Sequence, residues 1–440
     1  MRFSRFGTKF GGHTGIMDLM DDMGRALAGT EKKYMLGGGN PAKIPDVERI
    51  WRERFTEIMA DERGIEEMIG NYDTPQGRPS FLEALAALLR REFGWDIGPE
   101  NVAVTNGSQT AFFILLNLFS GRTPHETEAG SERTRRILFP LLPEYIGYAD
   151  QGLDPNTFVA CRPTVERLDD HTHKYHVDFT AVEETLRSAR EGRSEPIGAI
   201  CVSRPTNPSG NVLTDNELQR LDTLARKNGV PLIIDNAYGV PFPHIVFDDL
   251  FEGSAVPICN EHIVLGMSLS KIGLPGTRTG IIIASKEIVS TLSRANAILS
   301  LANTAVGQVI VEPLMRDGRL LELARSVITP YYRSRATHAR DFLLSRFDSG
   351  VPHSFHRIEG SIFLWLWLPD LPLSTIELYE RLKKRNVIVV PGEYFFFGDP
   401  TLDRWSHVKQ CMRINYGQPI DDVERGLSII AEEVNRLWSR

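Results

Sequence analysis

One lysine of the sequence ends an apolar run and is followed at once by a glycine-rich turn. Lys271 stands in the stretch SLSKIGLPGTRTG, which covers residues 268–280. Glycines let a backbone come close to a ligand, and a lysine whose pKa is lowered by its surroundings can form a Schiff base with a carbonyl group. A lone lysine is most often a solvated surface charge, so Lys271 has to be weighed together with other motifs.

Three further motifs also follow apolar runs. Asp235 ends the run PLIID, where a buried carboxylate needs a cationic partner such as a protonated pyridine nitrogen; otherwise it is an N-cap or part of a core ion pair. Asn207 lies in RPTNPSGN after the run GAICVS, and its amide either donates to a phenolate oxygen or only shapes a turn. The stretch TNGSQ at 105–109 precedes an apolar helix, whose first N–H groups can bind a phosphate.

These four motifs, in this order, resemble the class I and II aminotransferases, which are fold type I enzymes that use pyridoxal 5'-phosphate (PLP). The most specific elements are the Asn-Pro-x-Gly turn at Asn207, the Asp-x-x-Tyr motif at Asp235 and Tyr238, and the Ser-x-Ser-Lys and Gly-x-Arg-x-Gly motifs between Ser268 and Gly280. The resemblance covers nearly the whole chain. It implies a transaminase that takes an amino acid and a 2-oxo acid as substrates.

The resemblance also implies roles for single residues around the cofactor. Lys271 would bind PLP covalently and act as the catalytic base, and Asp235 would pair with the pyridinium nitrogen. Asn207 and Tyr238 would hydrogen-bond the 3'-oxygen. The other cofactor-binding residues would be Gly107, Ser108, Gln109, Tyr145, Ser268, Arg278 and Tyr72. Of these, Tyr145 would stack on the ring, and Tyr72 would reach the phosphate of the neighbouring subunit in a homodimer.

The resemblance implies a binding site for the substrate as well. Arg413 would grip the α-carboxylate, since a planar guanidinium makes a bidentate pair with such a group. Gly39, in LGGGNPA, would add a backbone contact, and Asn207 would also face the substrate. Whole segments such as LGGGNPA, NYDTPQG and VSRPTNPSGN resemble the aminotransferases that act on valine and pyruvate. The resemblance thus implies transfer between L-valine and pyruvate, giving 3-methyl-2-oxobutanoate and L-alanine by a ping-pong mechanism.

Other functions stay open at this point. The same cofactor motifs would serve an aminotransferase for aromatic or broad substrates, or a PLP-dependent β-eliminating lyase. A dicarboxylate substrate would need a second arginine, for which Arg204 and Arg294 are candidates, and Ile16 and Tyr34 are candidates for an apolar pocket wall. A regulator with an aminotransferase-like domain is disfavoured, because the resemblance begins within the first 40 residues and leaves no room for a helix-turn-helix.

The order of the apolar runs predicts how these motifs are held. Strands are expected at 101–105, 137–140, 198–203, 231–235, 263–267 and 279–284, with helices at 110–119 and 214–228. Strands that are apolar throughout imply a sheet covered by helices on both faces. The expected fold class is therefore α/β, of fold type I, with a mostly parallel sheet between helices and a smaller α+β domain.

The C-terminal third has a different pattern. Helices are expected at 321–347, with a break at Pro330, at 374–384 and at 420–438, and strands at 361–368 and 412–416. The expected large PLP-binding domain is 51–319, and residues 1–50 and 320–440 would form the small domain. A loop is expected at 168–173. Because no acidic partners accompany the histidines in and after it, no metal site is expected there.

Composition excludes several classes of partner. The 440 residues include 50 Lys and Arg against 57 Asp and Glu, and this net charge of -7 argues against nucleic-acid binding. No apolar run is long enough to span a bilayer, and no signal peptide is visible, so a cytoplasmic protein without a membrane partner is expected. No two of the 4 cysteines form a CxxC pair, and four reduced thiols are expected in a cytosolic protein, with neither a zinc site nor a disulfide framework.

Overall fold

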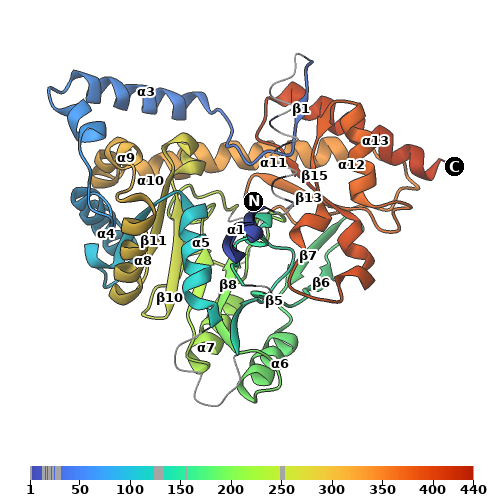
Figure 1. Ribbon diagram of the computed structural model, residues 1–440. Helices are drawn as coiled ribbons and strands as arrows, with labels where there is room; N and C mark the ends of the chain where they lie inside the picture. The colour runs from blue at the N-terminus through green and yellow to red at the C-terminus, as the bar shows by residue number, and fades with distance from the viewer. Residues whose placement is uncertain are drawn as a thin grey trace.

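The protein is built around two β-sheets that lie side by side (Figure 1). The computed structural model describes residues 2–11, 15, 17, 21, 24, 31–122, 133–154, 156–247 and 253–439. The larger sheet, with β8, β10 and β11, occupies the left and centre of Figure 1, and the smaller sheet, with β6, β7, β13 and β15, lies at the right.

The larger sheet has eight strands, in the order β2-β11-β10-β9-β8-β4-β3 with β5 beside β4. The pairs of β10 with β9, β9 with β8, β8 with β4, and β4 with β5 are parallel, whereas β11 is antiparallel to both of its neighbours. The prediction of a mostly parallel sheet is thus confirmed. The strands are β2 (Val102–Asn106), β3 (Gly121–Arg122), β4 (Thr134–Phe139), β5 (Phe158–Ala160), β8 (Ile197–Ser203), β9 (Leu232–Asp235), β10 (Ile263–Ser268) and β11 (Thr279–Ile283).

Successive side chains of these strands are buried on opposite faces of the sheet. Ile233 and Val264 belong to the core on one face, which α5 and α8 cover, and Ile234 and Leu265 belong to the core on the other face, with α4, α7 and α9. Continuous apolar strands result from this double burial, as expected. These helices are α4 (Pro79–Phe93), α5 (Ser108–Phe119), α7 (Asp215–Lys227), α8 (Lys286–Ser300) and α9 (Val306–Asp317).

The smaller sheet has six strands in the order β15-β16-β13-β12-β7-β6. Four of these strands come from the C-terminal third, whereas β6 and β7 come from the middle of the chain. The loop expected at 168–173 is therefore shorter than predicted: it is the turn between β6 and β7, and its last two residues belong to β7. A further short pair, β1 with β14, is parallel. The strands are β6 (Thr164–Arg167), β7 (Thr172–His176), β12 (Ser354–His356), β13 (Phe363–Trp367), β15 (Val390–Pro391), β16 (Cys411–Asn415), β1 (Tyr34–Met35) and β14 (Val387–Ile388).

The long helix expected at 321–347 is divided into three parts. A π-helical turn separates α10 from α11, and Pro330 lies in the first turn of α11, where its missing N–H leaves no helical bond unmade. Capping boxes at Thr214 and Ser374 begin α7 and α12, two of the helices expected from the sequence. The remaining helices are α1 (Arg5–Phe10), α3 (Pro45–Ala60), α6 (Phe179–Arg190), α10 (Arg319–Leu323), α11 (Thr329–Leu344), α12 (Thr375–Lys384) and α13 (Ile420–Trp438).

Two general expectations concern the membrane and the cysteines. Within the part of the chain that the structure describes, no helix has the length and the apolar character needed to cross a membrane. Cys161, Cys201, Cys259 and Cys411 are free thiols.

Candidate active site

A cavity of about 360 Å³ lies at the carboxyl ends of the central strands of the larger sheet. Strand β9 ends at Asp235, β10 ends three residues before Lys271, and Asn207 follows the end of β8. This edge is where α/β sheets commonly bind ligands. Of the predicted site residues, those that line the cavity are Gly39, Ser108, Gln109, Tyr145, Asn207, Asp235, Tyr238, Ser268, Lys271, Arg278 and Arg413.

Gly107 and Tyr72 do not line this cavity. Gly107 precedes α5 with φ of 92°, and a Cβ there would lie 2.0 Å from Nη2 of Arg278, so only a glycine lets this guanidinium lie against the helix start. Tyr72 is 84% exposed on the outside of the chain. A side chain so placed can serve a cavity only in another subunit.

The amine of Lys271 is held inside the cavity. Its Nζ donates to the carbonyl oxygen of Gly39 and lies 5.4 Å from the centre of the Tyr238 ring. Burial, helped by the positive charge of Arg413, lowers the pKa of Lys271 to about 8. A substantial fraction of this amine is therefore neutral at mildly alkaline pH and able to attack a carbonyl group.

Asp235 is a carboxylate in need of a cation. Its oxygens accept hydrogen bonds from the Tyr148 hydroxyl and, at 3.0 Å, from the backbone N–H of Ala237. Burial raises the pKa of Asp235, and these two donors oppose the rise. No ion pair joins it to any side chain in the described ranges. A protonated ring nitrogen in the cavity would complete its environment.

Arg413 is a buried cation that does not use all of its hydrogen-bond donors. It extends from β16, is 3% exposed, and lies with its Cζ 4.1 Å from the Phe363 ring centre and 5.0 Å from that of Phe395. Nη1 donates to Oδ1 of Asn207 at 2.7 Å and Nη2 to the carbonyl oxygen of Gly37 at 2.8 Å. Its Nε has no hydrogen-bond partner among the residues described. Burial lowers the pKa of Arg413 to about 10, which leaves it charged at neutral pH and suited to an anion.

The glycine-rich segment 37–39 is fixed through its carbonyl groups. Arg413 binds that of Gly37, Nδ2 of Asn415 binds that of Gly38 at 2.5 Å, and Lys271 binds that of Gly39. Gly37 and Gly39 line the cavity, and Gly39 faces the lysine amine, with a built Cβ 4.0 Å from Nζ. Sequence reasoning missed Asn415, although its place two residues after Arg413 on one strand puts both on one face.

The other end of the cavity collects groups that bind anions. Ser268 Oγ lies 3.0 Å from Ser270 Oγ and accepts from the N–H of Ser270 at 3.1 Å. Arg278 is exposed toward the cavity beside Gly107, and Ser108 lies in the first turn of α5. Hydroxyl groups, a guanidinium and a helix N-terminus together make a site for a phosphate group. Ser270 was missed, although the Ser-x-Ser-Lys motif contains it.

A third missed group, Glu144, is hydrogen-bonded to the backbone of Tyr145. The Glu144 carboxylate is fully buried and accepts from the N–H groups of Tyr145 and Ser203, each at 2.9 Å. Burial raises the pKa of Glu144 to about 8. It ties the segment that carries Tyr145 to the end of β8. A glutamate next to Pro143 in a turn carries no sequence signal for such a role.

Several other candidates lie away from the cavity. The guanidinium of Arg204 is buried and binds the carbonyl oxygen of Leu213 and the Asp215 carboxylate, whereas Arg294 is exposed on α8. Tyr34 lies in β1, and Ile16 falls outside the described residues. The three histidines in and after the expected loop at 168–173 lie in or beside β7, outside the cavity. His171 stacks on His353, His173 is buried, and His176 contacts Glu166 and Glu217.

Comparison with known proteins decides the family. The sequence pattern described as "Aminotransferase class I and II" matches residues 154–430, which is more than half of the chain. The chain belongs to the class I and II aminotransferases. This aminotransferase is 47% identical, over 440 residues, to valine–pyruvate aminotransferase of Escherichia coli K12, with 100% of this chain and 99% of the relative covered.

Solved structures agree with that assignment. The putative amino-acid aminotransferase from Psychrobacter arcticum 273-4 has a TM-score of 0.94 and 42% identity, with 100% of both chains covered. Valine–pyruvate aminotransferase from Salmonella typhimurium LT2 has a TM-score of 0.83 and 44% identity, with 97% of this chain and 100% of that chain covered. The α/β fold of type I expected from the sequence is thereby confirmed.

The cofactor of this aminotransferase is pyridoxal 5'-phosphate, as the family requires. The cavity fits it in three places. Asp235 offers a carboxylate with no cationic partner among the described side chains, Ser268 and Arg278 lie with the start of α5 at the phosphate end, and Lys271 presents an amine of lowered pKa. The residues present therefore fit a cofactor that combines a basic ring nitrogen, a phosphate group and a carbonyl group.

Exchange of Asp235 should weaken both cofactor retention and turnover. In Asp235→Ala and Asp235→Asn we expect kcat to fall by about 100-fold or more, because the ring nitrogen loses its buried counter-charge. Titration of the apoenzyme with PLP, alongside steady-state kinetics, measures both effects. Asp222→Asn, a buried carboxylate of α7 outside the cavity, is the matched control. Normal turnover in the Asp235 variants would place the counter-charge elsewhere.

Proposed function

We propose that this aminotransferase moves the amino group between L-valine and pyruvate, giving 3-methyl-2-oxobutanoate and L-alanine. The observation that carries the proposal is Arg413, a buried guanidinium in the cavity with an unused donor, in a chain 47% identical over its whole length to a valine–pyruvate aminotransferase. An α-carboxylate is the anion common to all four substrates and products.

Each site residue has a task in this reaction. Bound PLP supplies the carbonyl group that takes up the amine and the conjugated ring that accepts electrons from Cα. Arg413 holds the α-carboxylate and so fixes the direction of the Cα–H bond. Lys271 would take the proton from Cα and deliver it, on the same face, to the cofactor carbon that carries the amine nitrogen. Asp235 keeps the ring nitrogen protonated, and Asn207 and Tyr238 bind the 3'-oxygen.

The rest of the cavity supports a small apolar side chain. Among its described lining residues the cations are Lys271, Arg278 and Arg413, and each has a task at the carboxylate, the amine or the phosphate. None of these residues is therefore left to pair with a second substrate carboxylate, and burial of an unpaired carboxylate is costly. The apolar part of the lining comes from Ile146, Pro205, Ala237 and Pro275. Such a wall accepts a methyl or an isopropyl group with modest discrimination.

The substrate proposal predicts an order of reactivity. We expect kcat/KM for L-valine and L-alanine to exceed that for L-aspartate and L-glutamate by about 100-fold or more, because a hydrophobic pocket leaves their second charge unpaired. L-phenylalanine should also be a poorer donor. The constants are measured with suitable 2-oxo acids for each donor. Faster transfer from aspartate or phenylalanine would overturn the substrate assignment while leaving the enzyme an aminotransferase.

The domain division is also proposed from the chain order. Residues 51–319 would form the PLP-binding domain, and residues 1–50 with 320–440 the small domain. Support comes from the parallel pair of β1 with β14 and from the contact of Arg413 with Gly37, both of which join the N-terminal segment to the C-terminal third. The β6–β7 hairpin would then be the strand contribution of the large domain to the smaller sheet.

We further propose a homodimer in which each subunit completes the other's site. Tyr72 is 84% and Ile298 85% exposed, and Leu299 and Leu301 add to the same apolar surface. Asn303 donates to the carbonyl oxygen of Pro75 at 2.8 Å, which holds the Tyr72 segment against residues 298–303. A continuous exposed apolar surface is typical of a subunit interface, and two-fold pairing is the commonest closed arrangement.

The dimer proposal predicts that one charged side chain introduced into the proposed interface separates the two subunits. Ile298→Asp should convert the dimer to a monomer with little activity, whereas Ile420→Asp, on the exposed start of α13, should leave the dimer intact. Sedimentation equilibrium at assay concentrations distinguishes the two states. A wild-type enzyme that is active as a monomer would contradict this proposal.

A further inference from the structure

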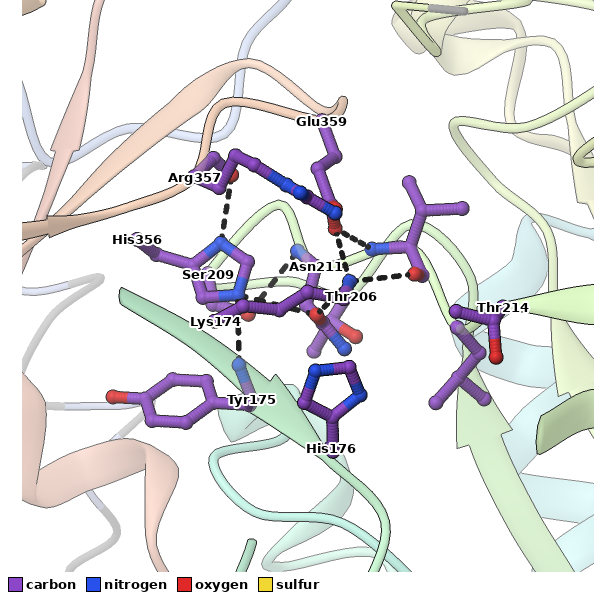
Figure 2. A network of polar contacts seen from close by, with 12 residues as sticks. Lys174, Tyr175, His176, Thr206, Ser209, Asn211, Thr214, His356, Arg357 and Glu359 are labelled. Carbon is purple, nitrogen blue, oxygen red and sulfur yellow. Dashed lines mark hydrogen bonds and ion pairs between the residues drawn. The ribbon is translucent and has the colours of Figure 1, made fainter. Parts of the chain in front are cut away.

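A buried ion pair outside the cavity joins the smaller sheet to the turn that carries Asn207 (Figure 2). Lys174 of β7 is 1% exposed and Glu359, which follows β12, is 0% exposed, with Nζ and Oε2 2.6 Å apart. Removing two charges from water is costly unless their remaining donors and acceptors are used. The other hydrogen bonds of Lys174 and Glu359 therefore identify the part of the chain that the pair fixes in place.

Every hydrogen-bonding position of the pair is used. Lys174 Nζ also donates to Oδ1 of Asn211 and to the carbonyl oxygen of Val212, each at 3.0 Å. Oε2 of Glu359 accepts from the N–H of Val212 at 2.9 Å, and its other oxygen accepts from Arg357 Nε at 2.8 Å. Three of these contacts end on two successive residues, Asn211 and Val212. Figure 2 labels Asn211 within the network, between His356 and Glu359.

Asn211 closes the turn in which Asn207 lies. The N–H of Thr206 donates to the carbonyl oxygen of Asn211, and the N–H of Gly210 donates to that of Thr206, both at 2.8 Å. Gly210 has φ of 74°, and a Cβ there would lie 2.6 Å from the carbonyl oxygen of Gly360. The turn thus lies directly against the segment that begins at Glu359.

The same segment supports the backbone leading from Tyr238. The N–H of Phe247 donates to the carbonyl oxygen of Glu359 at 2.9 Å, and the N–H of Ser361 donates to that of Ile245 at 3.0 Å. Ile245 in turn donates its N–H to the carbonyl oxygen of Tyr238 at 2.8 Å. Residues 359–361 therefore contact both chain segments that carry ligands for the 3'-oxygen.

We propose that Lys174 and Glu359 are positioning residues, which fix the turn of Asn207 and, through Asn207, orient Arg413 for the substrate carboxylate. The link is direct, because Oδ1 of Asn207 accepts from Nη1 of Arg413 at 2.7 Å. With that oxygen used, the amide Nδ2 of Asn207 is the group left for the cofactor. The inference rests on the proposed roles of Asn207 and Arg413.

A purely structural role would need no charges. Replacing a buried ion pair with uncharged side chains of similar shape is often neutral or stabilising for folding. Methionine in place of Lys174 would, however, lack the Nζ donor that now binds Asn211 Oδ1 and the carbonyl oxygen of Val212. The double variant Lys174→Met with Glu359→Gln therefore separates folding from positioning.

The test uses the PLP-loaded enzyme and three measurements. They are the thermal midpoint, the pKa read from the absorbance of bound PLP without any amino acid, and the kcat and KM for L-valine. In the double variant we expect a thermal midpoint near that of the wild type, a shifted absorbance pKa, and a KM raised at least about tenfold, since misplacement by about 1 Å can cost about 100-fold. Arg385→Met, which breaks ion pairs that join the end of α12 to Glu432 and Glu433 of α13, is the control that should change neither the absorbance pKa nor KM.

A second variant keeps the proposal testable if the double variant does not fold. Asn211→Ala leaves the ion pair in place but removes its side-chain link to the turn, and should shift the same two quantities. A folded variant of either kind with wild-type absorbance pKa and wild-type KM overturns the inference. The absorbance titration needs no substrate, so it gives its answer even if the wild-type enzyme rejects L-valine, which is the failure of the proposed function.

Discussion

Replacing Lys271 with alanine is expected to abolish transamination while the protein still folds and binds PLP without a covalent bond. The amine of Lys271 lies in the cavity with a lowered pKa, and in the proposed mechanism it is the group that moves the Cα proton. The phosphate-binding groups at Ser268 and Arg278, and the counter-charge at Asp235, stay in place. We expect kcat to fall by about 10,000-fold or more, because proton transfer at Cα loses its general base. Steady-state kinetics and the absorbance of bound PLP measure the two effects.

The control for this variant is an exposed lysine. Lys286→Ala, at the start of α8 and paired only with Glu100 at the surface, should leave both kcat and the PLP spectrum unchanged. Substantial transamination by Lys271→Ala in the absence of added amines would show that another group carries the proton.

Replacing Arg413 with leucine is expected to destroy the affinity for amino acids and 2-oxo acids. The buried guanidinium holds Asn207 and Gly37, and Arg413 lines the cavity. Loss of one partner of a buried charge pair typically costs about 2–5 kcal/mol, so kcat/KM should fall by about 30-fold or more. Arg413→Lys should recover only part of this loss, because an ammonium cannot form the bidentate pair.

Arg294→Leu provides the comparison, since Arg294 is exposed on α8 outside the cavity. It should leave kcat/KM unchanged for every donor. A value for Arg413→Leu within about threefold of the wild type would mean that the substrate carboxylate binds elsewhere in the protein.

The site residues that follow strand ends could be located from the sequence, because the position of a strand in the chain also fixes where the residues after it lie. Asp235, Lys271 and Asn207 each come directly after an apolar run, and the parallel strands bring those run ends to one edge of the sheet. The predicted elements differ from the observed ones mainly at their boundaries. The break near Pro330 was also predictable, because proline cannot continue a helix from the preceding turn.

Contacts between distant parts of the chain could not be seen in the same way. Gly39 and Arg413 were placed together by the resemblance, but the hydrogen bond from Asn415 that holds Gly38 depends on the packing of β16 against residues 36–40. Lys174 lies in a short polar strand just after a segment predicted as loop, and Glu359 lies 185 residues away. Their pairing depends on β7 joining the smaller sheet, which no local pattern indicates.

The central claim is that this cavity transfers an amino group from L-valine to bound cofactor, and a single half-reaction tests it most directly. PLP-loaded enzyme is mixed with L-valine in the absence of any 2-oxo acid, and the cofactor absorbance is followed together with the products. The account predicts conversion to the aminated cofactor with one 3-methyl-2-oxobutanoate per active site and no free ammonia. Added pyruvate should then restore the original spectrum and yield one L-alanine per site. No conversion with L-valine, or release of ammonia in place of amination of the cofactor, would contradict the account.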